Sequence, residues 1–280
     1  MKLSKNQRFG LISFIVLLII AYLVTVEPWK SSSQKLETSF IESPPSEIRI
    51  QWINLATGYP LTHTTDTIRT YKGFDLGYNE QFEQASWVAY VLTKNEIESG
   101  SITRTDNFRS DQSIESGSAS LGDYRGSGFD RGHLAPAGDM KWDPLAMSES
   151  FLMSNMSPQA PSFNRGIWKE LESKTREWAV KKDSIYVITG PVLDPIDSFI
   201  GENEVGVPLY YFKVLVDLSP PSHSFIAFLL PNTGSSDDLV RFAISVDSLE
   251  QVTGYDFFAS APDSSVIEWL EGQLELESWN

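Results

Sequence analysis

The chain has 280 residues, 41% of them hydrophobic, so it is long enough to bury a sizeable core in one large domain or two small ones. Its formal net charge of -15 argues against a protein that coats nucleic acid through bulk electrostatics, although an enzyme needs only a local basic patch. The absence of cysteine excludes disulfides, zinc-thiolate sites and thiol nucleophiles, which leaves three histidines as the scarce chemical resource.

The N-terminus carries an export signal. Basic residues lie within 1–8, and the apolar run 9–26 that follows contains no charge. An uncleaved membrane anchor takes about 17 to 25 residues and a cleaved signal peptide about 7 to 15, and the end of this run offers no small-residue cleavage site. We therefore predict a cytoplasmic end at 1–8 and a transmembrane helix at 9–26, with the rest extracytoplasmic. If the segment is instead cleaved, the protein is secreted or periplasmic.

A single folded domain is predicted after a tether. The tract 27–47 is polar and contains proline, which is typical of a linker, and the domain is expected over 48–280. Short strands and loops are expected up to about Gly77. A buried strand is predicted at 86–93, and a long polar loop from Lys94 to about Asp123. No internal repeat or inner linker follows, so the pattern indicates one α+β domain.

Helices and strands are predicted in the second half of this domain. A short helix is expected to begin at Asp143, with Pro144 in its first turn. A longer helix is expected over 164–182 with Asn164 as its N-cap. Its apolar face would carry Trp168, Leu171, Thr175, Trp178 and Ala179. Strands are predicted at 184–192, 209–218 and 223–232, the last two as a hairpin, and two short helices at 246–254 and 263–277.

The segment FDRGHLAPAGDM, 129–140, places His133 among charged and glycine residues, whereas His63 and His223 lie in loop and strand-edge contexts. Taken alone, His133 fits a packed imidazole as well as a base held for chemistry. The run Gly126-Ser-Gly128 is not followed by the Gly-Lys-Ser/Thr of a phosphate-binding loop. The chain also has no G-x-S-x-G elbow for an acyl-transfer serine and no H-E-x-x-H zinc pair.

The remaining polar residues suit phosphodiester hydrolysis. A neutral imidazole can deprotonate water, a hard oxygen-bound cation can stabilise developing negative charge, and arginine can hold a phosphate. Asn164 and Glu172 lie eight residues apart, near one helical face, and offer oxygen atoms to such a cation. Alternatively, Asn164 is only a helix N-cap and Glu172 only a solvated surface charge, and the sequence leaves both interpretations open. The other candidates are Asn155, Gln159, Arg125, Arg131, Arg165 and Arg176.

Three separated motifs resemble one known family. DRGH at 130–133, SNMSPQ at 154–159 and NRGIWKELE at 164–172 resemble, in this order, the DNA/RNA non-specific endonucleases of the ββα-metal fold. The similarity extends from about Trp87 to the C-terminal helices. It implies an α+β fold with a central, mainly antiparallel sheet flanked by helices. It also implies a divalent-metal-dependent endonuclease that cuts DNA and RNA with low sequence specificity, in a family where homodimers are common.

The resemblance also implies roles for individual residues. His133 matches the general base that activates water, and Asn164 matches the metal-binding asparagine, with Mg²⁺ expected and Mn²⁺ as the alternative. Glu172 matches a carboxylate that acts through water on the metal. The other matches are a supporting amide at Asn155, a phosphate-side arginine at Arg176, an active-site arginine at Arg131, and a further arginine before DRGH at Arg104 or Arg109.

Two other hypotheses are compatible with the sequence. The first is a catalytically inactive, anchored nucleic-acid-binding or scaffold module, which the acidic charge favours and the presence of His133, Asn164 and Glu172 together disfavours. The second keeps the chemistry but takes a nucleotide or another small phosphodiester as substrate. Basic residues between Arg125 and Lys182 favour a polymeric polyanion instead.

Overall fold

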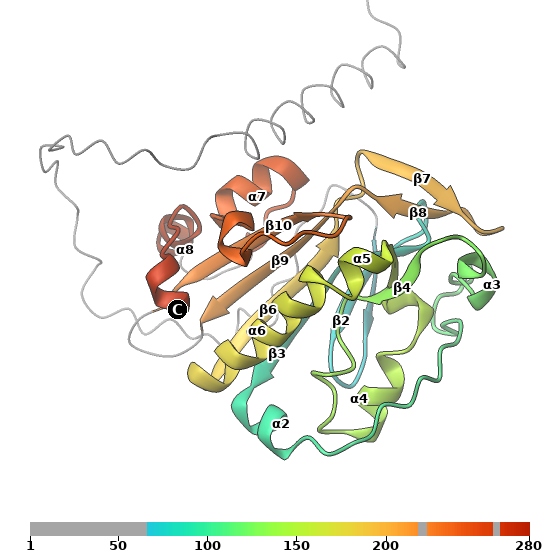
Figure 1. Ribbon diagram of the computed structural model, residues 1–280, viewed down its shortest axis with the longest axis horizontal. Coiled ribbons are helices and arrows are strands. Elements are labelled where there is room, and N and C mark those ends of the chain that lie inside the picture. Colours follow the sequence, from blue (N-terminus) through green and yellow to red (C-terminus); the bar gives the residue numbers. More distant parts are fainter. Residues whose placement is uncertain (1–65, 218–222, 260–263) are drawn as a thin grey trace, which may run out of the picture. The chain divides into compact units, whose positions relative to one another are not determined.

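The computed structural model describes residues 66–217, 223–259 and 264–280, and a seven-stranded antiparallel sheet forms the centre of this part of the chain. The strand order is β1-β2-β3-β6-β9-β10-β11 (Figure 1). The predicted α+β class with a large antiparallel sheet is confirmed. The strands are β1 (Thr67–Thr70), β2 (Asp75–Asn79), β3 (Gln84–Thr93), β6 (Ser184–Pro191), β9 (Tyr210–Asp217), β10 (Phe225–Pro231) and β11 (Ala243–Ile244).

Strands β6 and β9 are buried over nearly their whole length because side chains cover both faces of the sheet. Successive side chains of a strand point to opposite faces. Tyr211 therefore packs against Trp168 of α6 (Ile167–Lys181), while the next residue, Phe212, contacts Phe257 on the other face. This two-sided burial explains the continuous apolar runs from which the strands were predicted. The predicted pairing of the last two strands is confirmed by the β9/β10 register; residues 218–222, the turn between them, lie outside the described residues.

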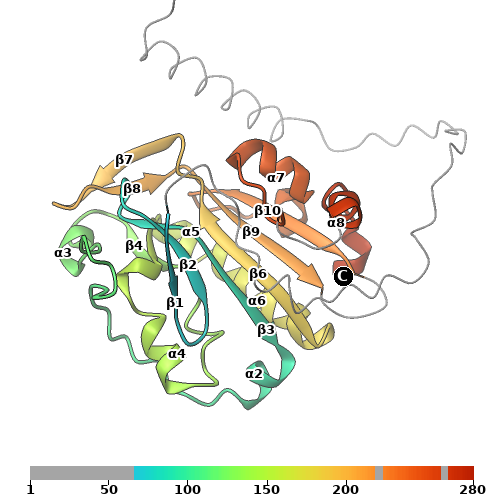
Figure 2. The same cartoon turned by 180° about the vertical axis from the view of Figure 1, so that it is seen from behind.

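A ββα unit is inserted between β3 and β6. It consists of β4 (Asp130–His133), the antiparallel β5 (Met156–Gln159), the short α5 (Pro161–Asn164) and α6. Helix α4 (Pro144–Glu149) lies within the β4/β5 connection; Pro144 is in its first turn as predicted, and Asp143 is its N-cap. Figures 1 and 2 show α6 running along the sheet beside β3 and β6, with β4 and α5 at its N-terminal end.

The apolar face of α6 is predicted correctly, and its beginning is not. The five residues expected on that face are all buried. Asn164, however, is the last residue of α5, and Gly166 occupies the N-cap position of α6 without any side-chain cap. A separate turn forms because Pro161 begins α5, where its missing N–H costs no hydrogen bond. Asn164 is thereby free of the capping role assigned to it.

The polar loop predicted from Lys94 to Asp123 contains helical turns. Helix α2 (Lys94–Ser99) begins at a capping box, in which Thr93 accepts from the Glu96 N–H and Glu96 accepts from the Thr93 N–H. Helix α3 (Leu121–Tyr124) has the same arrangement. Other unpredicted elements are the hairpin of β7 (Ile196–Ile200) and β8 (Val205–Pro208) and the 3₁₀ turns η2 (Met153–Asn155), η3 (Leu239–Phe242) and η4 (Leu276–Trp279).

The C-terminal helices α7 (Val246–Thr253) and α8 (Ser264–Glu271) lie within the two segments predicted for them. The predicted transmembrane segment 9–26, the tether 27–47 and the expected domain start at 48 fall outside the described residues. Within 66–217, 223–259 and 264–280, no helix is both long enough and apolar enough to cross a bilayer.

Candidate active site

The β4/β5 pair presents His133 at the end of β4, opposite Met156. Gly132 precedes it, and a β-carbon at that position would lie 2.1 Å from Cδ of Gln159 on the neighbouring strand. A larger residue would collide with the Gln159 side chain. The glycine of DRGH therefore leaves room for that side chain against β4, next to the histidine.

Asn155 holds the backbone segment that follows His133 in place. Its Oδ1 accepts from the Ala135 N–H (2.9 Å), and its Nδ2 donates to the carbonyls of Ala135 (2.9 Å) and Ser150 (2.8 Å). These three bonds engage the carbonyl and both protons of a fully buried amide. The geometry therefore makes Asn155 a supporting residue, and its polar atoms face the protein backbone.

The imidazole of His133 is held in an apolar, cation-flanked environment. The ring packs edge-on against Phe151 (5.0 Å between centroids) and Phe108 (5.7 Å), and only 9% of the residue is exposed. Burial, assisted by the charges of Arg104 and Arg131, lowers the pKa of His133 from 6.5 to about 3. Its Nε2 is buried and has no hydrogen-bond partner among the described residues. At neutral pH the ring is therefore uncharged and able to accept a proton.

Two of the candidate arginines, Arg131 and Arg104, lie around this ring. The guanidinium of Arg131 lies 4.1 Å from the Phe108 ring centroid, and that of Arg104 lies 4.8 Å from the Phe151 centroid. Both phenylalanine rings contact His133, so both guanidinium groups lie near the His133 ring. Arg109 is used differently, because its guanidinium donates to the carbonyl of Ser148 (2.9 Å) and thereby ties the loop to α4. The structure thus separates the two arginines that the sequence left unresolved.

Asn164 ends α5 with its amide group fixed and its carbonyl oxygen available. Its Nδ2 donates to Oδ2 of Asp130 (2.9 Å), and Arg165 donates to both oxygens of the same carboxylate (2.8 and 2.6 Å). These bonds, Arg165 first, lower the pKa of Asp130, which is therefore ionised at neutral pH. The Asn164 Oδ1 has no hydrogen-bond partner among the described residues. This oxygen is the kind of ligand that a hard divalent cation takes, so the residue fits the metal that the sequence implies.

Asn232 secures the turn that carries Asn164, and the sequence reasoning did not identify it. Its Oδ1 accepts from the Ala160 N–H (2.8 Å), and its Nδ2 donates to the carbonyls of Pro158 and Pro208 (3.0 Å each). The start of α5 is thus joined to the end of β5 and to β8. The available signal in the sequence was the asparagine of LLPN at 229–232, directly after an apolar strand.

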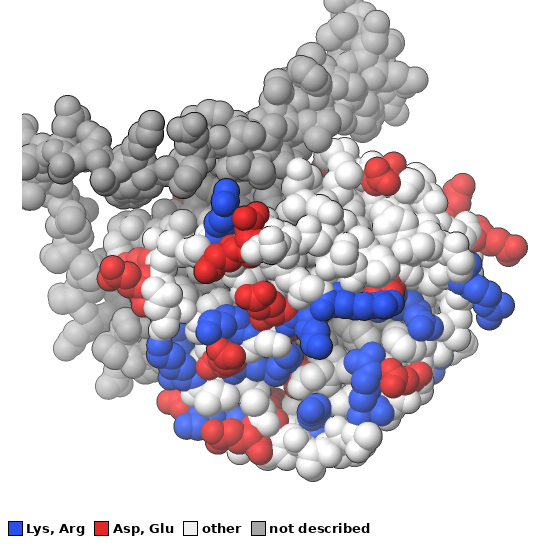
Figure 3. Space-filling view, viewed as in Figure 1, with Lys and Arg blue, Asp and Glu red and all other residues white. Residues whose placement is uncertain are grey.

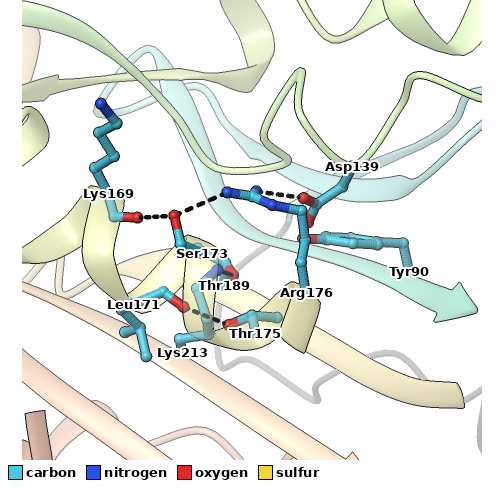
Figure 4. Close-up of polar contacts among 9 residues, drawn as sticks. All are labelled: Tyr90, Asp139, Lys169, Leu171, Ser173, Thr175, Arg176, Thr189 and Lys213. Carbon is cyan, nitrogen blue, oxygen red and sulfur yellow. Dashed lines mark hydrogen bonds and ion pairs between the residues drawn. The ribbon is translucent and has the colours of Figure 1, made fainter. Parts of the chain in front are cut away.

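Arg176 lies on α6, where a buried carboxylate fixes it. Its Nη1 pairs with Oδ1 of Asp139 (2.8 Å), and Tyr90 donates to the other oxygen of the same carboxylate (2.8 Å). Its Nη2 donates to Ser173 (3.1 Å). Figure 4 shows the guanidinium lying between Asp139 and Ser173. Gly138 leaves room for it, because a β-carbon there would lie 3.0 Å from Nη1.

Glu172 is half-buried one turn before Arg176, and a buried lysine from the sheet acts on it. Burial raises the pKa of Glu172, and the positive charge of Lys213 is the strongest influence that opposes the rise. Lys213 is fully buried on β9; its Nζ donates to Thr189 (2.5 Å) and lies 5.0 Å from the Trp168 ring centroid. Its pKa is lowered by its own burial. The sequence reasoning missed Tyr90, Asp139 and Lys213; a single lysine inside the apolar strand YYFKVLVD was the signal for the last.

One positive charge acts on both parts of the site, the end of β4 with His133 and helix α6 with Glu172. The charge of Arg104 acts on His133 and also on Glu172, so it links the β4 end of the site to α6. Figure 3, drawn in the orientation of Figure 1, shows Lys and Arg side chains gathered across the region of α5, α6 and β4, with acidic side chains between them. A neutral base, an amide oxygen and several cations therefore share one basic face, an arrangement suited to attack on a phosphodiester.

The comparison with known proteins agrees with this chemistry. The family model described as DNA/RNA non-specific endonuclease matches residues 54–264. The chain belongs to the DNA/RNA non-specific endonuclease family.

Individual relatives cover most of the chain. It is 34% identical to mitochondrial Endonuclease G of Caenorhabditis elegans over 228 residues, which are 75% of this chain and 73% of the relative. It is 32% identical to human mitochondrial Endonuclease G over 204 residues (68% and 69%), and 31% identical to a nuclease of Nostoc sp. over 258 residues (86% and 90%). A crystal structure of an EndoG/EndoGI complex, which concerns the mechanism of EndoG inhibition, matches with a TM-score of 0.68 and 28% identity over 76% of this chain and 93% of that chain.

Proposed function

We propose that this nuclease hydrolyses internal phosphodiester bonds of DNA and RNA with the help of Mg²⁺, or Mn²⁺ as the alternative, and that His133 is its general base. The observation that carries the proposal is a buried, neutral imidazole bordered by Arg104 and Arg131. A neutral ring accepts a proton from water, and the flanking guanidinium groups attract the phosphate that this water attacks. Family membership supports the substrate class.

Each side chain then has one task. His133 takes the proton of the attacking water on a ring nitrogen. Asp130 holds the amide of Asn164 so that Oδ1 stays turned away from that carboxylate. When bound at Asn164, a divalent cation supplies positive charge that stabilises the transition state and the leaving oxygen. Glu172 contributes negative charge and a hydrogen-bond acceptor on α6, and Arg176 holds a phosphate oxygen on the same helix, anchored by Asp139.

The arginine that stabilises the transition-state charge is Arg104 in this proposal. Arg104→Ala is expected to lower kcat by about 100-fold, the size of effect seen when one charged donor to a developing oxyanion is removed. Arg109→Ala is the matched control; it removes the same charge from the same loop and is expected to lower the melting temperature, because Ser148 loses its partner, with kcat nearly unchanged. Rates at saturating plasmid DNA and thermal unfolding measure the two effects. Equal losses of kcat in both variants would refute the distinction.

One assay tests the function as a whole. Supercoiled plasmid, a structured RNA and a small chromogenic phosphodiester are incubated with the full-length protein in Mg²⁺, in Mn²⁺ and in chelator. We expect nicking and linearisation of the plasmid and fragmentation of the RNA with either metal, little turnover of the small diester, and no cleavage with chelator. Turnover of the small diester alone would indicate a phosphodiesterase for small substrates. Binding of nucleic acid without any cleavage would indicate the inactive module.

A further inference from the structure

Helices α7 and α8 bring three carboxylates together outside the ββα unit. One oxygen atom from each of Asp247, Glu250 and Glu271 lies within 4.8 Å of the other two. Asp247 lies in the first turn of α7, Glu250 follows one turn later, and Glu271 is the last residue of α8. Two consecutive helices therefore bring acidic side chains together at one point.

This point lies on the opposite side of the sheet from the catalytic residues. Glu250 accepts a hydrogen bond from the Phe257 N–H (2.8 Å), and the Phe257 ring packs on Phe212 of β9. The neighbouring residues of that strand, Tyr211 and Lys213, point to the other face and contact Trp168 of α6. The sheet thus stands between the three carboxylates and α6.

Glu271 is the member of the cluster that most needs a partner. Only 2% of the residue is exposed, and its Oε1 is buried without a hydrogen-bond partner among the described residues. A buried carboxylate without a partner is strongly destabilising when ionised, and proteins compensate it with a proton, a positive charge or a metal ion. The carboxylates of Asp247 and Glu250 beside it offer only more negative charge.

Within 66–217, 223–259 and 264–280, no basic side chain is among the main charges acting on Glu250 and Glu271. The strongest charges acting on both residues are negative and come from Asp247, Asp256 and Glu268, and Glu250 adds to those acting on Glu271. Burial and this repulsion raise the pKa of Glu250 to about 7 and that of Glu271 to about 8. Arg241, the only Lys or Arg after Lys213, pairs with Asp237. Glu271 also sits at the C-terminal end of α8, where the helix dipole favours a cation.

We propose that Asp247, Glu250 and Glu271 bind a calcium ion at a site separate from the catalytic metal. Oxygen-only ligands select a hard cation. Ca²⁺ holds six to eight oxygens at about 2.3–2.6 Å in irregular geometry, so opposite ligands stand roughly 5 Å apart, whereas Mg²⁺ requires about 2.0–2.1 Å and an octahedron. Three carboxylate oxygens that all lie within 4.8 Å of one another are close enough to share one such ion. Asp247 and Glu250 are only half-buried, so water can complete the coordination.

Calcium binding is tested on the metal-free full-length protein by thermal unfolding and calorimetric titration at pH 7.5. Calcium at about 100 times its Kd is expected to raise the melting temperature by at least about 5 °C, and Mg²⁺ at the same concentration by clearly less. Glu271→Gln is expected to weaken the calcium affinity at least about tenfold and to remove the shift. It should leave the metal-free protein as stable as the wild type, because Glu271, with its pKa raised to about 8, is mostly protonated at pH 7.5 when no metal is bound. Glu268→Gln removes one charge from the same helix outside the ligand set and should keep the calcium response.

The catalytic metal and simple protonation are controlled separately. Asn164→Ala should keep the Glu271-dependent calcium shift, since that residue lies on the other side of the sheet. Because protons compete for the same carboxylates, the calcium shift should grow between pH 6 and pH 8. A metal-free melting temperature that falls between pH 5 and 8 with no effect of calcium would show that the carboxylates only share a proton, and would overturn the proposal. A calcium shift that persists in Glu271→Gln would overturn it as well, and so would a Mg²⁺ shift equal to the calcium shift in the Asn164→Ala background, where the catalytic metal ligand is absent.

Discussion

His133→Ala is expected to cut plasmid DNA at least about 100-fold more slowly than the wild type, because a positioned general base contributes roughly 10² to 10⁴ in rate. The fold should survive, since the β4/β5 pairing and the bonds of Asn155 to Ala135 and Ser150 do not involve the imidazole. The measurements are initial cleavage rate, DNA binding in chelator and melting temperature. Unimpaired cleavage by this variant would remove His133 from the mechanism.

His223→Ala is the matched control for this experiment. His223 precedes β10, and its Nδ1 lies 3.2 Å from the carbonyl oxygen of Asp217, in a turn region away from β4. Its removal is expected to leave the cleavage rate unchanged. Loss of activity in both histidine variants together with a lower melting temperature would indicate unfolding in place of lost chemistry.

The pH dependence of kcat/KM and of folding stability tests the environment of His133 independently of any substitution. Its pKa of about 3 keeps the ring neutral far below the ordinary value of 6.5, so the acid limb of kcat/KM should not report an ordinary histidine. The sign for stability follows from proton binding. Between pH 6.5 and about 3 the unfolded chain binds the proton and the folded chain does not, so this residue makes the protein less stable as the pH falls through that range.

Asn164→Ala is expected to produce the second large effect, a shift of the half-maximal Mg²⁺ concentration for cleavage to about 10- to 100-fold higher values, the loss typical of a disturbed metal site. The variant removes the free Oδ1 and also the donor that Asp130 receives. Arg165 still holds both oxygens of that carboxylate, so the local structure should persist. Cleavage rates are measured across a Mg²⁺ titration. An unchanged midpoint would exclude Asn164 as a ligand.

Asn155→Ala tests whether Asn155 has a structural role that differs from the metal-binding role of Asn164. It leaves the N–H and carbonyl of Ala135 and the carbonyl of Ser150 without their partner, which costs roughly 1–3 kcal/mol of stability for a buried polar group. The half-maximal Mg²⁺ concentration should stay as in the wild type. A raised midpoint with normal stability would instead give Asn155 a direct role at the metal.

Local sequence signals predicted most of the secondary structure. The apolar runs of β3, β6, β9 and β10 and the buried face of α6 were predicted because their periodicity is imposed by the sheet and the helix themselves. The start of α6 was predicted wrongly because Asn164 resembles a cap, whereas Pro161 begins a separate turn. The capping boxes at Thr93 and Ser120 were present in the sequence and overlooked inside a polar stretch.

The sequence by itself determined the family, through DRGH, SNMSPQ and NRGIWKELE in order, and with it the candidate residues His133, Asn164 and Glu172, because these motifs are short and contiguous. Only the tertiary structure decided what surrounds them. The depressed pKa of His133 depends on Phe151 and Arg104, and the charge facing Glu172 comes from Lys213 on a later strand. Such effects arise from burial and from charges that the strand order brings together, and spacing along the chain carries no record of either.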